Sequence, residues 1–190
     1  ANVCPVSAIT MSVDDEGFLR PVVHDNCVEC SICAQKCPQM QPLSFASGAS
    51  ECYAVQCNDS IRQLGSSGGV FAALAEYFIS KGGVVVGAAF TEDCRTLKHI
   101  TVTDKTQLFR LYKSKYVQSE MGTVYREVKN FLDSDKTVLF SGCPCQVKAL
   151  ENYLGKVYKN LLTVDNLVHG VPSTMAYNKY LYEIVGPDNK

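Results

Sequence analysis

The stretch CVECSICAQKCP, residues 27–38, decides how the first part of the chain folds. Its spacing, C-x2-C-x2-C-x3-C-P, is typical of bacterial iron–sulfur proteins. Three thiols at two-residue spacing, those of Cys27, Cys30 and Cys33, wrap a loop around one cluster, and the next helical turn directs Cys37 away. A structural zinc site is the alternative. Zinc usually takes its four thiolates as two separated pairs, so the spacing favours iron and sulfur.

The residues before this run form a cysteine–proline pair and a hairpin. Cys4-Pro5 has the form of the end of an earlier cysteine run. Residues 9–13 alternate like a strand, residues 14–17 form a turn, and residues 18–23 return as a second strand. Pro21 confines that second strand to a sheet edge, because proline cannot donate to a ladder.

This order of elements matches the second half of a two-cluster ferredoxin. On that fold Cys4 joins Cys27, Cys30 and Cys33 around one cluster, and Cys37 ligates the other cluster. The remaining ligands of the other cluster would lie upstream of Ala1. We therefore expect residues 1–42 to be an N-terminally truncated α+β ferredoxin-like module, and the chain to be a fragment cut at both ends.

The bulk composition is that of a globular protein. The chain has 190 residues, is 46% hydrophobic and carries a net charge of −1, so nothing indicates a nucleic-acid or anionic membrane partner. The longest apolar run, residues 84–90, is far too short to span a membrane. Ten cysteines with cluster spacing and no visible signal peptide indicate a reducing cytoplasm.

The rest of the chain alternates strand and helix patterns. Residues 39–50 have the composition of a linker. Strands are expected at 52–55, 84–90, 98–103, 137–140 and 161–168, and helices at 66–81, 121–132, from 141–146 onward and after 172–174. This alternation predicts that residues 43–190 form an α/β domain with a mixed, mostly parallel sheet.

The ordered set of short motifs resembles the coenzyme F420 hydrogenase/dehydrogenase beta subunit family. The matching pieces follow the ferredoxin-type module in order along the chain, which makes the set specific although each piece is weak alone. They are Cys52-Tyr53-Ala54, Arg62 with Ser66-Ser67-Gly68-Gly69, residues 114–119, Phe140-Ser141-Gly142, Pro144-Cys145-Gln146 and residues 169–173. The resemblance implies a C-terminally truncated, flavin-linked oxidoreductase that passes electrons between 4Fe–4S clusters and FAD. It also implies a redox partner protein or subunit and a two-electron partner such as a deazaflavin coenzyme.

Two groups of residues are candidates for holding the FAD. Ser66, Ser67, Gly68 and Gly69 stand at a helix start, where backbone N–H groups and the helix dipole favour a phosphate. A helix N-cap with a flexible turn suits the same residues equally well. Lys115 and Tyr116 are candidates because of the resemblance, and a solvated turn is their alternative.

Two residues that follow strands are candidates for catalysis. Cys145 stands near a helix N-terminus, where a thiol tends to have a lowered pKa; a small buried residue in a tight turn is the alternative. His169 follows a strand, where α/β proteins form ligand sites, and could hydrogen-bond or protonate a flavin or substrate. Its alternative is a histidine satisfied by the backbone. The spacing of Cys52, Cys57, Cys143 and Cys145 permits a second cluster but does not require one.

The chain departs from the family pattern at two positions. The family commonly has a cysteine directly before the His-Gly pair, where this chain has Val168. Cys143 stands where the family usually has another residue. Besides the flavin-linked oxidoreductase, two functions stay open at this point: a flavin-free electron relay whose α/β part docks a partner, and a zinc-stabilised binding module.

Overall fold

The computed structural model describes residues 2–40 and 51–186. The first module contains β1 (Ile9–Val13), β2 (Leu19–Val23) and the short helix α1 (Ile32–Lys36). The two strands pair antiparallel, with Ile9 opposite Val23 and Val13 opposite Leu19. The hairpin and the edge position of Pro21 that the sequence predicted are therefore confirmed.

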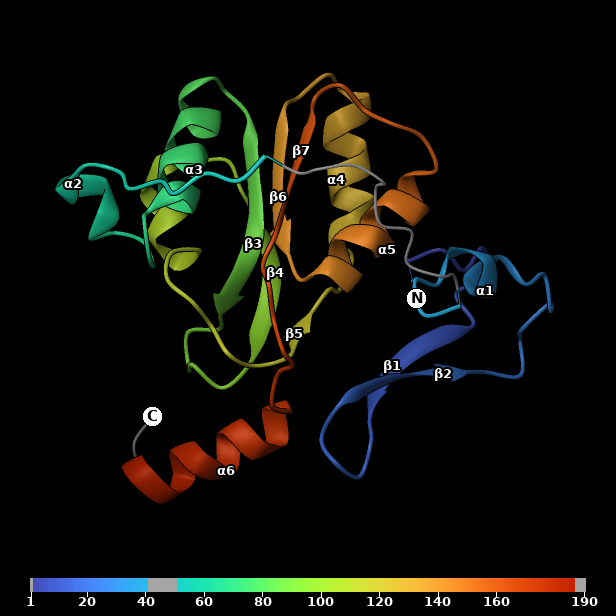
Figure 1. The fold of residues 1–190 in the computed structure, drawn as a ribbon. Helices are drawn as coiled ribbons and strands as arrows, with labels where there is room; N and C mark the ends of the chain where they lie inside the picture. Colours follow the sequence, from blue (N-terminus) through green and yellow to red (C-terminus); the bar gives the residue numbers. More distant parts are fainter. Residues whose placement is uncertain (1, 41–50, 187–190) are drawn as a thin grey trace.

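A five-stranded mixed sheet forms the centre of the α/β domain. Its strands lie in the order β5-β4-β3-β6-β7. Their bounds are β3 (Val84–Phe90), β4 (Leu97–Val102), β5 (Ser119–Glu120), β6 (Val138–Gly142) and β7 (Leu161–Asp165). β3, β6 and β7 are parallel, β4 runs antiparallel to β3, and β5 is parallel to β4. The predicted mixed, mostly parallel sheet is confirmed, and Figure 1 shows its helices on both sides.

One apolar layer lies between helix α3 and the sheet. α3 (Val70–Ser80) and the 3-10 helix η1 (Lys105–Arg110) cover this face, together with the short α2 (Asp59–Arg62) beyond them. Ala75, Leu108 and Leu139 lie in the buried cluster between them. Gly82, in the left-handed conformation at φ +73°, allows the chain to leave α3 and enter β3 within three residues.

A second apolar layer covers the other face of the sheet. It is built by α4 (Val124–Asp133) and α5 (Pro144–Leu154). Val128, Leu150 and Phe140 are fully buried there, and burying a phenylalanine contributes about 1.5–3 kcal/mol. α5 begins with proline in its first turn and ends at Gly155, which is left-handed.

The last helix, α6 (Thr174–Val185), lies at the carboxyl edge of the sheet (Figure 1). The Oγ of Ser173 accepts from the N–H of Ala176 and caps the helix, which begins where the sequence predicted a helix after residues 172–174. Tyr177 stacks on Phe90 at the end of β3, with ring centroids 5.5 Å apart. Over residues 2–40 and 51–186, no helix combines the length and the apolar character that a membrane span needs.

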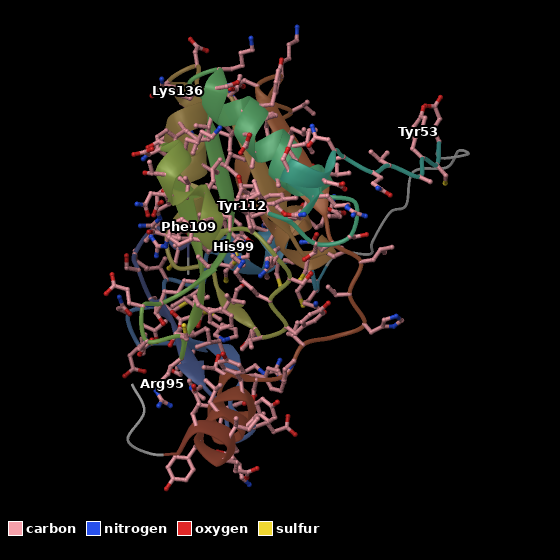
Figure 2. The ribbon with its side chains drawn as sticks, turned by 90° about the vertical axis from the view of Figure 1, so that its left-hand side faces the viewer. Tyr53, Arg95, His99, Phe109, Tyr112 and Lys136 are labelled. Carbon is pink, nitrogen blue, oxygen red and sulfur yellow. The ribbon has the colours of Figure 1, made fainter. Side chains whose placement is uncertain are left out.

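Several sequence expectations differ from the structure. The strand expected at 52–55 is wrong, because this segment has no regular structure and Tyr53 is 76% exposed. Figure 2 shows Tyr53 standing away from the body of the domain. β7 ends at Asp165 rather than at Val168. The linker expected at 39–50 lies largely outside the described residues.

Candidate functional site

Four cysteines of the first module line one small cavity. Cys4, Cys27, Cys30 and Cys33 surround a space of about 20 Å³, together with apolar neighbours such as Ile9. Cys4 precedes the hairpin in the sequence, whereas the other three cysteines follow it. The structure therefore brings together the four thiols that the sequence assigned to one site.

Hydrogen bonds across the base of the hairpin hold Cys4 beside the cysteine run. The N–H of His24 donates to the carbonyl oxygen of Ala8 at 2.9 Å. The side-chain amide of Asn26 donates to the carbonyl oxygen of Val6 at 3.1 Å. These contacts fix the segment that follows Cys4 against the segment that precedes Cys27.

The backbone around the cavity turns sharply and directs N–H groups at sulfur. Ser7, Glu29 and Ser31 have φ values of 54°, 52° and 59°, in the left-handed region that side chains seldom adopt. The N–H of Ala8 lies 3.1 Å from Cys4 Sγ, and the N–H of Glu29 lies 3.5 Å from Cys27 Sγ. Such N–H groups stabilise negative charge on thiolates.

The fifth predicted ligand is separate from the other four. Cys37 is half-buried and is not among the residues that line the cavity. None of the ten cysteines, all of which lie in the described residues, forms a disulfide. Within the described residues, no three His, Cys, Asp or Glu side chains converge closely enough to hold a single metal ion.

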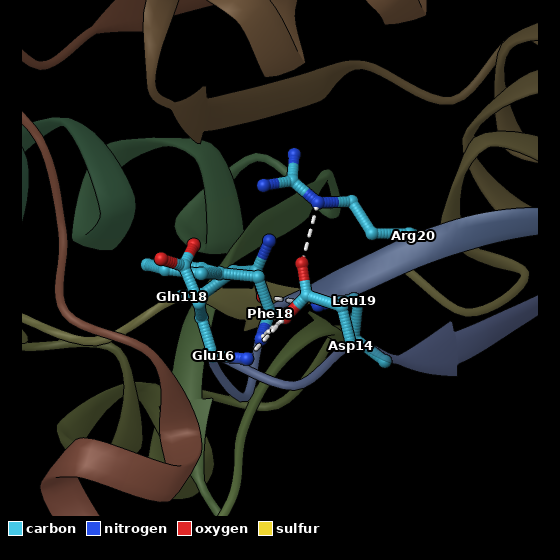
Figure 3. Close-up of polar contacts among 6 residues, drawn as sticks. All are labelled: Asp14, Glu16, Phe18, Leu19, Arg20 and Gln118. Carbon is cyan, nitrogen blue, oxygen red and sulfur yellow. Dashed lines mark hydrogen bonds and ion pairs between the residues drawn. The ribbon is translucent and has the colours of Figure 1, made fainter.

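The hairpin turn packs onto the α/β domain (Figure 3). The N–H of Leu19 donates to Gln118 Oε1 at 2.8 Å. Asp14 organises the turn by accepting from the N–H of Phe18 at 2.8 Å and pairing with Arg20 at 2.8 Å. The Arg20 hydrogen bond is the main reason that the pKa of Asp14 lies below its ordinary value.

Gly17 lies against the start of α6. A Cβ on Gly17 would come within 2.3 Å of Met175 Cβ and 2.9 Å of Ser173 Oγ, and its φ is +83°. Glycine is therefore needed at this junction for space and for backbone conformation. Further contacts join the side-chain amide of Asn2 to Gly122 O at 2.8 Å and that of Asn152 to Lys36 O at 3.2 Å.

The two candidate catalytic residues follow neighbouring strands at the carboxyl edge of the sheet. Gly142, at the end of β6, pairs with Asp165, at the end of β7. Cys145 is exposed in the first turn of α5, and His169 is exposed in the loop after β7. The N–H of Asn166 donates to Gly142 O at 2.9 Å and ties the two loops together.

A buried chain of hydrogen bonds supports this edge, and sequence reasoning missed its central residue, His99. His99 Nε2 lies 3.1 Å from the carbonyl oxygen of Ser141, so Nε2 must carry the proton. His99 Nδ1 therefore accepts from the hydroxyl of Ser119 at 2.9 Å. Ser119 in turn accepts from the side-chain amide of Gln146 at 2.9 Å, and Gln146 Oε1 accepts from the N–H of Cys143 at 2.9 Å.

The Ser141 carbonyl oxygen can only accept a hydrogen bond, and this fixes which atom donates in each bond of the chain. His99 is 8% exposed, and burial lowers its pKa from 6.5 to about 4, so the neutral ring persists at neutral pH. Burial also disfavours the charged form of Cys143, at the N-cap of α5, and so raises the pKa of its thiol. The network fixes the turn that presents Cys145.

The structure also joins the two predicted flavin-binding segments. The N–H of Ser114 donates to Ser66 Oγ at 2.9 Å, and their hydroxyl oxygens lie 3.1 Å apart. Lys115 Nζ donates to the carbonyl oxygens of Tyr112 at 2.7 Å and Lys113 at 3.1 Å. Burial lowers the pKa of Lys115 to about 8. Tyr116 is 75% exposed.

The glycines of the Ser-Ser-Gly-Gly turn pack against protein backbone. A Cβ on Gly68 would lie 2.1 Å from the carbonyl oxygen of Val55, and one on Gly69 would lie 2.8 Å from Arg62 Cα. Gly69 is the N-cap of α3 at φ +79° and provides no side-chain cap. The fold itself therefore requires these glycines.

These features define a class of protein in which a cysteine-rich hairpin module packs beside an α/β domain with a mixed sheet. Residues 52–126 match the sequence profile of the coenzyme F420 hydrogenase/dehydrogenase beta subunit, N-terminal region. This match confirms, over these residues, the family resemblance that the sequence predicted.

A solved structure supports the same fold. The chain is similar to one in the F420-reducing [NiFe] hydrogenase complex from Methanosarcina barkeri, with a TM-score of 0.52 and 17% identity. The likeness covers 68% of this chain and 47% of the hydrogenase chain, so the present chain spans about half the length of that relative. A comparison with curated proteins found no match.

Proposed function

We propose that the chain is the electron-transfer part of an iron–sulfur flavoprotein oxidoreductase, in which Cys4, Cys27, Cys30 and Cys33 hold a 4Fe–4S cluster. The observation that carries the proposal is the single cavity lined by these four thiols, although a hairpin separates Cys4 from the others in the sequence. When bound, such a cluster carries single electrons, and a flavin converts between single electrons and hydride.

The donor set fits a cluster better than a single zinc ion. Four thiols surround the cavity, and three of them come from one run at two-residue spacing. A structural zinc site usually takes its thiolates as two separated pairs, which this run does not provide. The N–H groups directed at Cys4 and Cys27 would stabilise the negative charge of a bound cluster.

We further propose FAD at the carboxyl edge of the α/β domain. The free N–H groups at the start of α3 and the hydroxyls of Ser66 and Ser67 would bind phosphate. The ammonium group of Lys115 would complement its charge. Cys145 and His169 would lie near the reacting ring, and His169 would hold or donate a proton there.

A flavin-free electron relay is the second candidate function. The observation that favours it is the use of Gly68 and Gly69 for packing against Val55 and Arg62. In addition, Lys115 already directs two of its three N–H groups at carbonyl oxygens. This candidate predicts a cluster but no bound flavin, even after incubation with FAD.

Anaerobic purification followed by iron, zinc and flavin analysis tests the proposal. We expect iron, sulfide and visible cluster absorbance in the wild type, and flavin fluorescence after acid release. Cys30→Ser should abolish the cluster absorbance while the far-UV circular dichroism stays that of the folded α/β domain. Cys94→Ser is the matched control, because Cys94 is an exposed free thiol outside the cavity. Cluster absorbance retained in Cys30→Ser, or zinc in place of iron, would contradict the assignment.

A further inference from the structure

A large cavity lies where the cysteine module meets the α/β domain. It has a volume of about 820 Å³ and is formed by α1 together with the C-terminal half of α5, the loop that follows it and β7. Gln35 and Lys36 contribute the wall from the module. Val157, on the rim, is 95% exposed, so the cavity is accessible from solvent.

The lining of this cavity is positively charged. Three lysines, Lys36, Lys148 and Lys156, face a single glutamate, Glu151, which leaves a net charge of +2. Glu151 pairs with Lys148 at 3.5 Å. Lys156 lies over the ring of Tyr158, with Nζ 4.5 Å from the ring centroid. Among the described residues, neither Lys36 nor Lys156 forms an ion pair with a carboxylate.

The cysteine module itself has the opposite charge. Residues 1–42 contain five acidic residues against Arg20 and Lys36, a net charge of −3. Lys36 lies between Cys33 and Cys37, at the end of α1 that reaches toward Gly155 at the C-terminus of α5. An anionic partner is therefore repelled by most of the module and attracted to its α1 side, where the lysines gather.

We propose that this lysine-lined cavity is the docking surface for an acidic electron-carrier protein that approaches the module at α1. The identity of the partner rests on the electron-transfer function proposed above. A partner that exchanges single electrons must come close to the cysteine module, whereas a hydride donor or acceptor must reach the flavin. Because the cavity borders α1, its position favours the one-electron partner, and its charge favours an acidic one.

The test measures complex formation with a purified acidic plant-type ferredoxin by isothermal titration calorimetry, at about 0.05 M and about 0.5 M salt. The test variant is Lys148→Glu combined with Lys156→Glu. Its matched control is Lys105→Glu combined with Lys81→Glu, on the α3 side of the sheet. Lys105 pairs with Glu76 at 3.5 Å, and Lys81 lies over the ring of Tyr77, so the control removes the same kinds of contact.

We expect the cavity variant to bind the ferredoxin at least about tenfold more weakly at low salt, and the control to change by less than about twofold. High salt should reduce the difference between wild type and cavity variant. Equal loss in both variants would overturn the proposal, because net charge alone would then explain it. Unchanged binding in the cavity variant would overturn it too.

Two further measurements separate this proposal from others. If FAD or NADPH binds the wild type and the cavity variant alone loses that binding, while ferredoxin binding is unaffected, the cavity takes a small phosphorylated ligand and the docking proposal is wrong. The iron content and visible spectrum of each variant report on the proposed cluster independently of docking. Loss of docking with an intact spectrum supports the docking surface, whereas a wild type without iron refutes the proposed function.

Discussion

The buried histidine His99 makes a quantitative prediction about stability and pH. Its pKa is about 4 in the folded protein because the ring is buried, against 6.5 for an ordinary histidine. Between these two values the unfolded chain binds a proton that the folded protein does not. The contribution of His99 is therefore fully present above pH 6.5 and is lost as the pH falls toward 4.

The size of the effect follows from the two pKa values. At pH 5 the linkage relation gives a loss of about 2 kcal/mol relative to neutral pH, and at pH 4 about 3 kcal/mol. Substitution His99→Gln keeps a group that can donate and accept hydrogen bonds but removes the titration. We expect the variant to be less stable than wild type at pH 7.5 and to lose about 2 kcal/mol less than wild type on going to pH 5.

Urea denaturation followed by far-UV circular dichroism, under reducing and anaerobic conditions, measures both free energies of unfolding. His169→Gln is the matched control, because it makes the same substitution in the exposed loop after β7. The control should follow the wild-type pH dependence. If His99→Gln also follows it to within about 0.5 kcal/mol, the burial of a neutral His99 is refuted.

Three further predictions concern single contacts. Ser119→Ala leaves His99 Nδ1 and the Gln146 amide without their partner and should destabilise by about 1–3 kcal/mol; Ser80→Ala, at an exposed hydroxyl, should change the unfolding free energy by less than about 0.5 kcal/mol. Gly68→Ala should destabilise by about 1–3 kcal/mol in the same assay, because its Cβ would lie 2.1 Å from Val55 O. Gly87→Ala, whose Cβ would meet its nearest atom at 3.7 Å, should stay within about 1 kcal/mol of wild type. Gly17→Ala should loosen the hairpin from α6 and speed chymotryptic cleavage after Phe18 relative to wild type, with Gly87→Ala again as the control; equal cleavage rates would show that the hairpin does not depend on this contact.

The buried strands were the easiest elements to predict from sequence. The run Val84–Phe90 has the predicted bounds because a strand covered on both faces is apolar throughout. β7 was predicted three residues too long, since Leu167 and Val168 continue its apolar pattern. In the structure Leu167 is fully exposed, and Asn166 has already turned to bond Gly142.

The candidate site was predictable only where spacing itself carries the chemistry. The run 27–38 identifies its own thiols, and the hairpin places Cys4 beside them. His99 gave a weaker signal: it occupies the inward register of β4, two residues after buried Leu97. Its partners come from β5, a two-residue strand, and from α5, and no local pattern connects such distant segments.

The junction between the module and the α/β domain has a consequence for synthesis of the chain. Leu19 bonds Gln118, 99 residues later, and Asn2 bonds Gly122, 120 residues later. At about 5–20 residues per second, the ribosome needs roughly 5–25 seconds to go from the first residue of each pair to its partner. During that interval the nascent hairpin lacks both of these contacts, and its own cross-strand pairing must hold it until residues 118–122 have been made.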